Sequence, residues 1–243
     1  MNGRAALVTG GSRGIGAATA LRLAQDGADV AISYVSDERA AAEVVAKIGA
    51  TGRRAVAVRA DAGDAQAPAE AVARTVEAFG RLDVLVNNAG IGVLGPLESL
   101  GAADVDRVLD VNVRGVFLTA QAAAAQLGRG GRIITVGSCM TQRVPGPGGT
   151  LYAMSKAALT GLNKALAREL GGRGITANLV HPGPVDTDMN PAGGPMAAGQ
   201  VSLTALGRFG TAEEIAAMVS FLAGDEAAYI TGAEFSVDGG HAA

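Results

Sequence analysis

A tyrosine and a lysine four residues apart give this chain its clearest chemical signal. Tyr152 and Lys156 stand at the start of an apolar helical pattern, and residues at this spacing lie on one face of a helix. A neighbouring ammonium favours the phenolate and lowers the pKa of a phenol, which suits the pair to acid–base chemistry. An exposed tyrosine beside a solvated lysine has the same spacing, so the motif alone leaves both interpretations open.

A serine lies close to this pair in the chain. Ser138 follows the run Arg132–Gly137, which has the composition of a strand, and its hydroxyl could hydrogen-bond an oxygen that Tyr152 protonates. The next segment, Cys139–Thr150, is rich in proline and glycine and is expected to form a loop across the candidate site. Cys139 is expected to pack rather than to act as a nucleophile, because no histidine is placed to activate it.

A glycine-rich turn near the N-terminus could hold phosphates. It reads Thr9-Gly10-Gly11-Ser12-Arg13-Gly14-Ile15-Gly16 and lies between a short apolar run and an Ala- and Leu-rich helical pattern. In that context Gly10 permits a tight turn, Gly14 allows the backbone to approach a pyrophosphate, and Gly16 allows close packing of helix on strand. The amides of the helix N-terminus would then face the phosphates. A turn without a ligand is the alternative.

The end of the next strand, Asp29–Tyr34, bears on which nicotinamide cofactor is used. A unit selective for NAD carries an acidic residue here to bind the ribose 2′-OH, whereas this chain has Tyr34, followed by Ser36. Arg13 projects from the glycine turn on the same side. A cation, a phenol and a hydroxyl favour a 2′-phosphate, so we expect NADP(H) rather than NAD(H). Two acidic residues at the start of the next helix weaken this argument, and Arg13 could simply be exposed.

Three further polar positions follow the third and fourth strands. Asp61 comes after the run Arg54–Arg59 and could accept a hydrogen bond from an adenine amino group, or could be a turn residue. The sequence Asn87-Asn88-Ala89-Gly90 suits either a loop against a ligand or a tight turn. Asn112 lies inside the long helical stretch Ala103–Leu127, where asparagine is unfavourable unless its amide is used.

Composition excludes several classes of protein. The chain has 243 residues, of which 49% are hydrophobic, with a net charge of −3, one cysteine and two histidines. It therefore offers no basic field for nucleic acid, no intramolecular disulfide and no metal site. The N-terminus enters a strand without a signal-peptide pattern, and no apolar run reaches membrane-spanning length. We expect a soluble cytoplasmic protein that binds neither nucleic acid nor membrane.

Strand-like and helical patterns alternate along the whole chain. The strand-like segments are Arg4–Thr9, Asp29–Tyr34, Arg54–Arg59, Leu82–Val86, Arg132–Gly137, Gly174–Val180 and Ala233–Val237. The helical segments are Gly14–Asp26, Asp37–Ala50, Asp64–Phe79, Ala103–Leu127, Tyr152–Leu170 and a last helix capped by Thr211. This alternation, with no break or repeat, predicts one α/β domain over residues 1–243, with seven parallel strands and helices on both faces of the sheet.

One segment without a clear pattern could move. Asn190–Gln200 is rich in glycine and proline and almost uncharged. We expect a substrate lid over about 184–205, although an ordinary surface loop would have the same composition. His181, which precedes it, is expected to be a packing residue in a loop.

Taken in order, these motifs resemble the short-chain dehydrogenase/reductase family. The resemblance runs over nearly the whole chain and includes Pro182-Gly183 and Thr187 after the sixth strand. It implies a Rossmann-type fold, NADP(H) as cofactor, and a catalytic tetrad of Asn112, Ser138, Tyr152 and Lys156. The cofactor-binding residues that it implies are Gly10, Ser12, Arg13, Gly14, Ile15, Gly16, Tyr34, Ser36, Asp61, Ala62, Asn88, Ala89, Gly90, Tyr152, Lys156, Pro182, Gly183, Val185 and Thr187.

The resemblance also implies a reaction. Hydride from NADPH would reduce a ketone to a secondary alcohol, reversibly, with Tyr152 as the general acid. Lys156 would lower the phenol pKa and hold the ribose, Ser138 would stabilise the developing alkoxide, and Asn112 would hold a water that returns the proton through Lys156.

Within the family the chain is most similar to the 3-oxoacyl-[acyl-carrier-protein] reductase and ketoreductase branch. The supporting runs are Arg168-Glu169-Leu170, Asp186-Thr187-Asp188-Met189 and Asp225–Gly232. This resemblance implies a homotetramer, and an acyl carrier protein as a possible partner of Arg129 and Arg173, which could equally be solvated arginines. Three hypotheses stay open: a carbonyl reductase of undefined ketone scope, a dedicated 3-oxoacyl reductase, and an NADP-binding protein without turnover.

Overall fold

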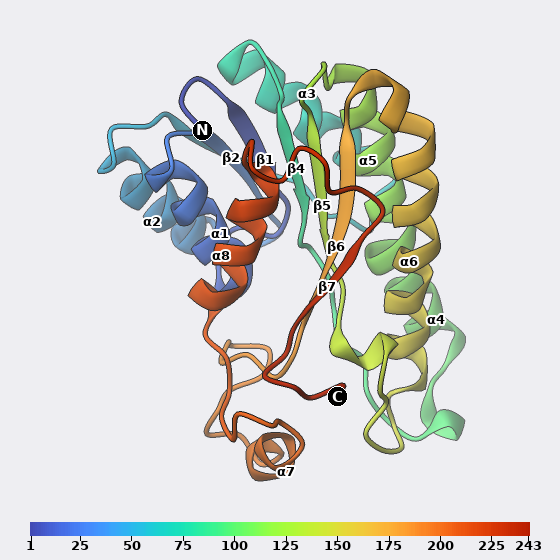
Figure 1. Cartoon of the computed structure of the whole chain (residues 1–243). Helices are drawn as coiled ribbons and strands as arrows, with labels where there is room; N and C mark the ends of the chain where they lie inside the picture. Colours follow the sequence, from blue (N-terminus) through green and yellow to red (C-terminus); the bar gives the residue numbers. More distant parts are fainter.

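Runs of Val, Ile, Leu and Ala that are apolar on both faces form the strands of one central sheet, as expected where helices cover both sides. A computed structural model describes all residues 1–243 (Figure 1). The sheet has seven parallel strands in the order β3-β2-β1-β4-β5-β6-β7, which confirms the predicted fold. The strands are β1 Ala5–Val8, β2 Asp29–Tyr34, β3 Ala55–Arg59, β4 Val84–Asn87, β5 Arg132–Val136, β6 Thr176–Pro182 and β7 Glu234–Val237.

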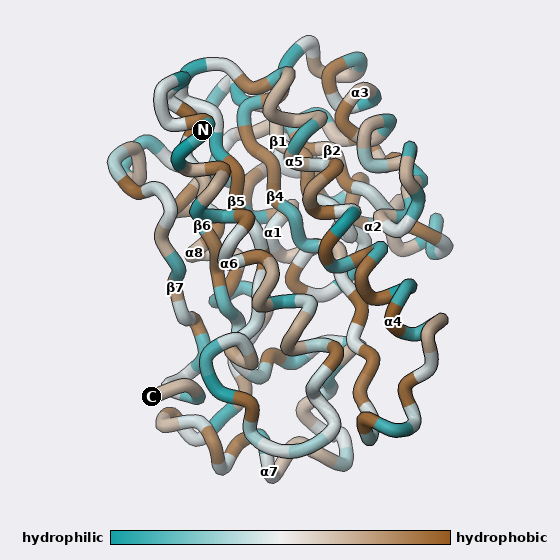
Figure 2. The backbone as a smooth tube through the Cα atoms, turned by 90° about the vertical axis from the view of Figure 1, so that its right-hand side faces the viewer, coloured by the Kyte–Doolittle hydropathy of each residue, from teal (hydrophilic) through white to brown (hydrophobic).

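Helices pack on the two faces of this sheet and divide the core in two. Helices α1 (Gly14–Gln25), α2 (Glu38–Gly49) and α8 (Ala212–Ala223) cover one face (Figure 1). Helices α3 (Ala67–Phe79), α5 (Gly115–Gln126) and α6 (Thr150–Leu170) cover the other. The strands β1, β4 and β5 are mainly brown in Figure 2, as befits their position between two apolar layers.

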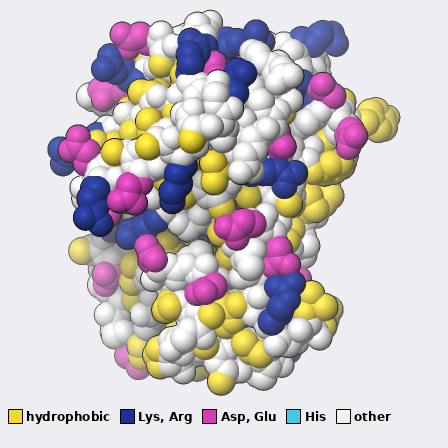
Figure 3. All heavy atoms as spheres, turned by 90° about the vertical axis from the view of Figure 1, so that its left-hand side faces the viewer, with side chains coloured by type: hydrophobic (Ala, Val, Ile, Leu, Met, Phe, Trp, Pro, Cys, Tyr) yellow, Lys and Arg dark blue, Asp and Glu magenta, His cyan; other side chains and the backbone are white.

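The surface carries charges of both signs. Figure 3 shows acidic and basic side chains interspersed on the face formed by α1, α2 and α8, without a field of one sign. No helix combines the length and the apolar composition needed to cross a bilayer. Nowhere do three or more His, Cys, Asp or Glu side chains gather as metal ligands would.

The long helix predicted over Ala103–Leu127 is not one regular α-helix. It divides into α4 (Ala102–Leu109), a π-helical turn at Asp110–Arg114, and α5. In that turn the amide of Gly115 donates to the carbonyl of Asp110, five residues earlier. Asn112 lies in the middle of the turn, and π turns of this kind are frequent at functional sites.

Other predicted boundaries shift by a few residues for local reasons. Helix α3 begins at Ala67 rather than Asp64, because the Asp64 carboxylate accepts from the amides of Gln66 and Ala67 at 2.6 and 3.0 Å and caps the turn. Strand β6 runs to Pro182, so His181 lies in the sheet, and its predicted place in a loop is wrong.

The segment expected to form a lid is more ordered than its composition suggests. It contains the short helix α7, Ala197–Ser202. Its ends are joined by two hydrogen bonds between the amides of Asn190 and Gln200, at 2.8 and 3.0 Å. The tie closes this stretch into a compact loop at the end of the molecule where the chain leaves β6 (Figure 1).

The start of α8 offers a test of the local capping argument. The Thr211 hydroxyl accepts from the amide of Glu214 at 3.3 Å, and the Glu214 carboxylate accepts from the amide of Thr211 at 2.8 Å, which makes a capping box. Thr211→Ala should lower the free energy of unfolding in urea by about 1 kcal/mol. Thr211→Ser keeps the hydroxyl and should stay close to wild type; equal losses in both variants would contradict the capping role.

Candidate active site

The glycine turn between β1 and α1 has the geometry expected of a phosphate-binding loop. Gly10 and Gly14 have φ of +63° and +53°, values that other residues rarely adopt. A side chain on Gly16 would place its Cβ 2.3 Å from the carbonyl oxygen of Gly10, so helix and loop touch only because this residue is glycine. Helix α1 begins without a side-chain cap, which leaves its first amides free for an anionic ligand.

Asn88 fastens this turn to the end of β4. Its side-chain amide donates to the carbonyls of Thr9 and Gly10 at 2.9 and 3.1 Å. In return, the Thr9 hydroxyl accepts from the amides of Asn88 and Ala89, both at 3.0 Å. The Asn88 amide nitrogen is therefore engaged within the protein, and its first task is to hold the loop in shape.

The residues predicted to contact a 2′-phosphate lie at the end of β2 and at the start of α1. Arg13 is 70% exposed, and the nearest carboxylate oxygen, on Asp188, is 4.0 Å from it. Ser36 is exposed, and Tyr34 packs partly against the core. Ser33, which sequence reasoning missed, accepts from the amide of Gly10 at 3.1 Å and so joins β2 to the glycine turn.

Asp61 is a turn residue in this structure and also an ion-pair partner. Its Oδ1 accepts from the amide of Gly63 at 2.9 Å, and its Oδ2 lies 3.0 Å from the guanidinium of Arg107. The carbonyl of Ala62 would lie 2.1 Å from a Cβ on Gly115, so this turn packs against the start of α5. The structure shows Asp61 in a turn, and a contact of its carboxylate with adenine stays a prediction.

Tyr152 and Lys156 share one face of α6, and the side chain of Lys156 is almost fully buried. Only 5% of Lys156 is exposed, and its ammonium donates to the carbonyl of Val136 at 3.0 Å. The Lys156 nitrogen lies 6.0 Å from the centre of the Tyr152 ring. Ser138 stands just after β5, and its hydroxyl lies close enough to the Tyr152 phenol to favour the phenolate, so these three residues converge at the carboxyl end of the sheet.

The direction of the Tyr152 pKa differs from the expectation based on sequence. Burial raises the pKa of Tyr152, and the hydrogen bond with Ser138 offsets only part of that rise. Burial also lowers the pKa of Lys156 to about 8, because no carboxylate contacts its ammonium. Desolvation thus acts on both groups, and the expectation that the lysine lowers the phenol pKa is wrong for the protein without ligand.

Asn112 is buried, and its side chain is occupied on both sides. Its carbonyl oxygen accepts from the amide of Ile91 at 2.9 Å, and its amide donates to the carbonyl of Ile91 at 2.9 Å and to the Ser155 hydroxyl at 3.0 Å. A Cβ on Gly90 would lie 3.3 Å from Asn112 and 3.2 Å from the Lys156 nitrogen, so both groups flank this glycine. Asn112 thereby joins the loop after β4 to α6.

The loop after β6 closes over the glycine turn. The Thr187 methyl would lie 3.3 Å from a Cβ on Gly14, and Val185 is buried and forms a bridge with Gly210. Pro182 pairs with β7 in the sheet, and the backbone of Gly183 packs closely against Asp238, which follows β7. Every residue in the predicted site therefore lies at the carboxyl end of the strands, including Ser12 and Ile15 at the start of α1.

Comparison with known proteins agrees with this geometry. A family model described as enoyl-(acyl carrier protein) reductase matches residues 10–242. A short-chain dehydrogenase from Burkholderia cenocepacia, solved in complex with NADP, is 55% identical and superposes with a TM-score of 0.99 over 100% of this chain and 99% of the other. The chain belongs to the short-chain dehydrogenase/reductase family.

Two curated members of this family show its functional range. A cyclic-di-GMP-binding biofilm dispersal mediator protein of Escherichia coli is 46% identical over 98% of this chain and 96% of its own length. A 3-oxoacyl-[acyl-carrier-protein] reductase of Synechocystis is 42% identical over 99% of this chain and 97% of its own length. Membership makes this chain an oxidoreductase of the short-chain type and leaves the substrate to be argued from the site.

The buried ammonium yields a stability prediction. The pKa of Lys156 is about 8 in the folded protein and 10.5 ordinarily, so the unfolded state binds more protons between these pH values. The free energy of unfolding of the protein without cofactor should therefore rise from pH 8 to 10.5. Below pH 8 the penalty is fully present, and Lys156→Met should raise Tm at pH 7 by a few degrees, on the order of 1–2 kcal/mol.

Scanning calorimetry over pH 7–10.5 measures this difference. The gap between Lys156→Met and wild type should shrink as the pH approaches 10.5. Lys47, which is exposed on α2, provides the matched control, and Lys47→Met should show no such trend. A Lys156→Met variant that is less stable than wild type at pH 7 would contradict the desolvation argument.

Proposed function

We propose that this protein transfers hydride from NADPH to the carbonyl carbon of a ketone and so forms a secondary alcohol, reversibly. The observation that carries the proposal is the convergence of Tyr152, Ser138 and Lys156 at the carboxyl end of the sheet, the same end at which the glycine turn lies. A phenol beside a serine hydroxyl, with an ammonium 6.0 Å from its ring centre, is suited to donate a proton to a substrate oxygen. No other pair of titratable groups at this edge of the sheet has this arrangement.

The residues of this chain divide the chemistry as follows. Tyr152, whose pKa is raised, keeps its proton at neutral pH and donates it to the ketone oxygen as that oxygen gains charge. The Ser138 hydroxyl donates a hydrogen bond to the same oxygen and stabilises the developing alkoxide. Lys156 holds its ammonium near the phenol and would bind the ribose hydroxyls of the cofactor. Asn112 holds the loop after β4. The water that returns a proton to Lys156 would be bound by the groups around Asn112.

The features of the loop fit a dinucleotide with a 2′-phosphate. Gly10, Gly14 and Gly16 leave the backbone open at the uncapped start of α1, and β2 ends without an acid. Arg13 presents an exposed guanidinium at the start of α1 and, with Tyr34 and Ser36 at the end of β2, would bind the 2′-phosphate. The nicotinamide would supply the hydride when bound, and Thr187 and Asn88 would contact its carboxamide and ribose sides.

The substrate is proposed to be an uncharged, partly apolar ketone. Exposed apolar side chains stand on the segments around the site: Leu94, Leu97, Val144, Met189, Met196 and Leu206. Segment 184–205, with α7, would close over the substrate as a lid. Burial raises the pKa of Cys139 to about 11, so this thiol beside Ser138 is no nucleophile.

Two alternatives make different demands on the chain. A dedicated 3-oxoacyl reductase needs a basic surface for an acyl carrier protein, but Arg173 already donates to the carbonyls of Ala124 and Leu127 at the end of α5. An NADP-binding protein without turnover is suggested by the relative that binds cyclic-di-GMP. The complete set of Asn112, Ser138, Tyr152 and Lys156 favours catalysis over the alternative without turnover.

A panel of ketones, 3-oxoacyl thioesters and cyclic-di-GMP separates these functions. Turnover of free ketones with NADPH supports the proposal, and turnover of thioesters alone supports the dedicated reductase. Binding of NADPH or cyclic-di-GMP with no oxidation anywhere in the panel supports the non-catalytic alternative.

We propose that the working form is a homotetramer in the cytoplasm. Sedimentation of the purified protein tests the oligomeric state.

Replacing the proton donor should remove turnover and spare cofactor binding. Tyr152→Phe loses the general acid, and kcat for ketone reduction should fall by about 10²–10⁴-fold. The dissociation constant for NADPH, measured by cofactor fluorescence, should stay within about threefold because the ring remains. Tyr229 is fully exposed, so Tyr229→Phe serves as the matched control. Full activity in Tyr152→Phe would refute the mechanism.

Removing the guanidinium of Arg13 should change cofactor preference. Arg13→Gln should weaken NADPH binding by about 10- to 100-fold, because a hydrogen bond to a charged group contributes about 1.5–3 kcal/mol. Binding of NADH, which lacks the 2′-phosphate, should hardly change. Arg74→Gln on α3, away from the loop, is the control. Equal losses for both cofactors would place Arg13 elsewhere than at the 2′-phosphate.

A further inference from the structure

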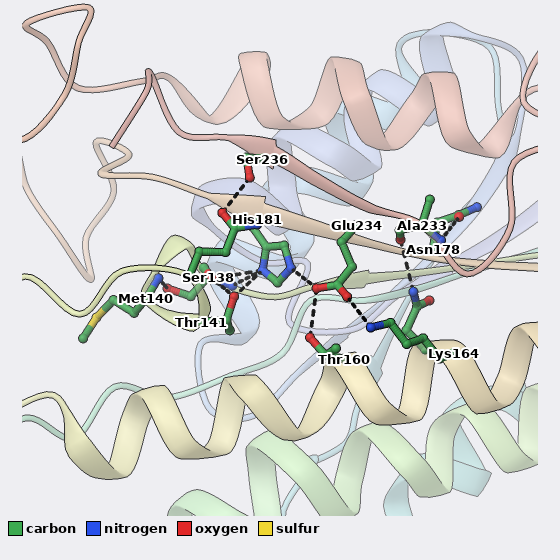
Figure 4. A network of polar contacts seen from close by, with 12 residues as sticks. Ser138, Met140, Thr141, Thr160, Lys164, Asn178, His181, Ala233, Glu234 and Ser236 are labelled. Carbon is green, nitrogen blue, oxygen red and sulfur yellow. Dashed lines mark hydrogen bonds and ion pairs between the residues drawn. The ribbon is translucent and has the colours of Figure 1, made fainter. Parts of the chain in front are cut away.

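A histidine that sequence reasoning treated as loop packing lies against the candidate catalytic serine. His181 is completely buried in β6. Its Nδ1 is 3.2 Å from the amide nitrogen of Ser138, 2.9 Å from the Ser138 carbonyl oxygen and 3.2 Å from the Thr141 hydroxyl (Figure 4). The imidazole therefore touches the main chain that presents the Ser138 hydroxyl to Tyr152.

The other side of the imidazole is held by a carboxylate. His181 Nε2 lies 3.0 Å from Oε2 of Glu234 on β7, and the same oxygen accepts from the Thr160 hydroxyl at 2.9 Å. The other oxygen of Glu234, Oε1, pairs with Lys164 at 3.4 Å (Figure 4). Burial would raise the pKa of Glu234, but hydrogen bonds from His181, Thr160 and Lys164 lower it overall. An ionised carboxylate only accepts hydrogen bonds, so the imidazole proton belongs on Nε2.

This tautomer decides what Nδ1 does. With its proton on Nε2, His181 offers a lone pair on Nδ1, which accepts from the amide of Ser138. The Thr141 hydroxyl then donates to the Ser138 carbonyl at 2.9 Å. Both polar groups of the Ser138 main chain thus have a partner. By holding the proton on Nε2, Glu234 leaves Nδ1, the nitrogen that faces Ser138, free to accept a hydrogen bond.

The chain of contacts returns to the helix that carries the proton donor. Tyr152, Lys156, Thr160 and Lys164 follow one another at intervals of four residues along α6, so they lie along one side of the helix. Thr160 and Lys164 hold Glu234, Glu234 holds His181, and His181 holds Ser138. Ser138 and Tyr152, which lie close to each other, are therefore also linked by this series of contacts across β7 and β6.

Space for the imidazole depends on the residue before Ser138. A Cβ on Gly137 would lie 2.6 Å from Nδ1 and 2.9 Å from Cε1 of His181. A real Cβ does not approach so closely, so the ring stands flush against the backbone at this position. The contact between the imidazole and the Ser138 main chain therefore depends on the glycine that directly follows β5.

We propose that His181 is a positioning residue, which with Glu234 holds Ser138 at the place from which its hydroxyl serves Tyr152 and the ketone oxygen. This rests on the proposed reduction of a ketone. Neither side chain touches substrate or cofactor in this role. Small displacements of a catalytic group are costly, since about 1 Å can change a rate by about 10²-fold.

Two substitutions of His181 separate its two contacts. Asn has a side-chain oxygen where Nδ1 stands, so His181→Asn keeps an acceptor for the Ser138 amide and loses Glu234. Gln reaches the position of Nε2, so His181→Gln keeps Glu234 and leaves the Ser138 amide without an acceptor. We expect kcat for ketone reduction to fall by about 10- to 100-fold in His181→Gln and by less than about tenfold in His181→Asn, with KM for NADPH within about twofold.

A matched control identifies a merely structural effect. Asn178 is also buried on β6, donates to the carbonyl of Ile230 at 2.8 Å and does not touch Ser138. Asn178→Ser should lower Tm and leave kcat unchanged at 25 °C. If His181→Gln behaves like Asn178→Ser, or if the order of Gln and Asn is reversed, the positioning role is overturned. Should the His181 variants not fold, Glu234→Gln keeps the volume and is expected to lower kcat about tenfold.

A measurement without substrate tests the same contacts. The chain has two histidines, so nitrogen NMR of wild type and of His241→Asn assigns the His181 signals. At pH 8 the proton should reside on Nε2, and a proton on Nδ1 would overturn the proposal. If wild type reduces no ketone, the proposed function fails and the positioning role falls with it. If wild type is active and His181→Gln keeps its kcat, only the positioning role fails.

Discussion

The site is built around an ammonium that is buried without a carboxylate. Lys156 is 5% exposed and donates to one carbonyl, that of Val136, so its charge is poorly compensated and its pKa falls to about 8. A buried charge of this kind lowers stability, and proteins tolerate such groups mainly where they act. The same burial raises the pKa of Tyr152 and keeps the phenol protonated, as a general acid must be at neutral pH. One desolvated pocket thus prepares both groups for proton transfer.

Polar side chains with complete sets of partners hold this pocket in shape. Asn112 bonds both the amide and the carbonyl of Ile91 and also the Ser155 hydroxyl, which in turn donates to the carbonyl of Tyr152 at 2.8 Å. The loop after β4, the π-helical turn and the first turn of α6 are therefore linked by hydrogen bonds. A buried amide that is fully bonded specifies one arrangement, since any displacement leaves a polar atom unpaired.

The sequence predicts the strands better than the site. Strand β2 has the predicted bounds, because an apolar run buried on both faces is visible in a single sequence. The residues of the predicted motifs do lie together at the carboxyl ends of the parallel strands. The π-helical turn at Asn112 and the hydrogen bonds of His181 were not predictable, because their partners lie 21 and 43 residues away in the chain. The pKa of Tyr152 was predicted in the wrong direction, since a single sequence shows a charged neighbour but not how deeply both groups are buried.

Residues without side chains determine the site as much as the residues with chemistry do. A Cβ would crowd the Lys156 ammonium and Asn112 at Gly90, the imidazole of His181 at Gly137, and the carbonyl of Gly10 at Gly16. At Gly137 and Gly16 the approach is too close for any side chain, and at Gly90 a side chain would force its neighbours to shift. Gly90 leaves room for the Lys156 ammonium, and Gly137, directly after β5, leaves room for the imidazole of His181 beside Ser138. Gly16, Gly90 and Gly137 are therefore the glycines at which the candidate site depends on the absence of a side chain.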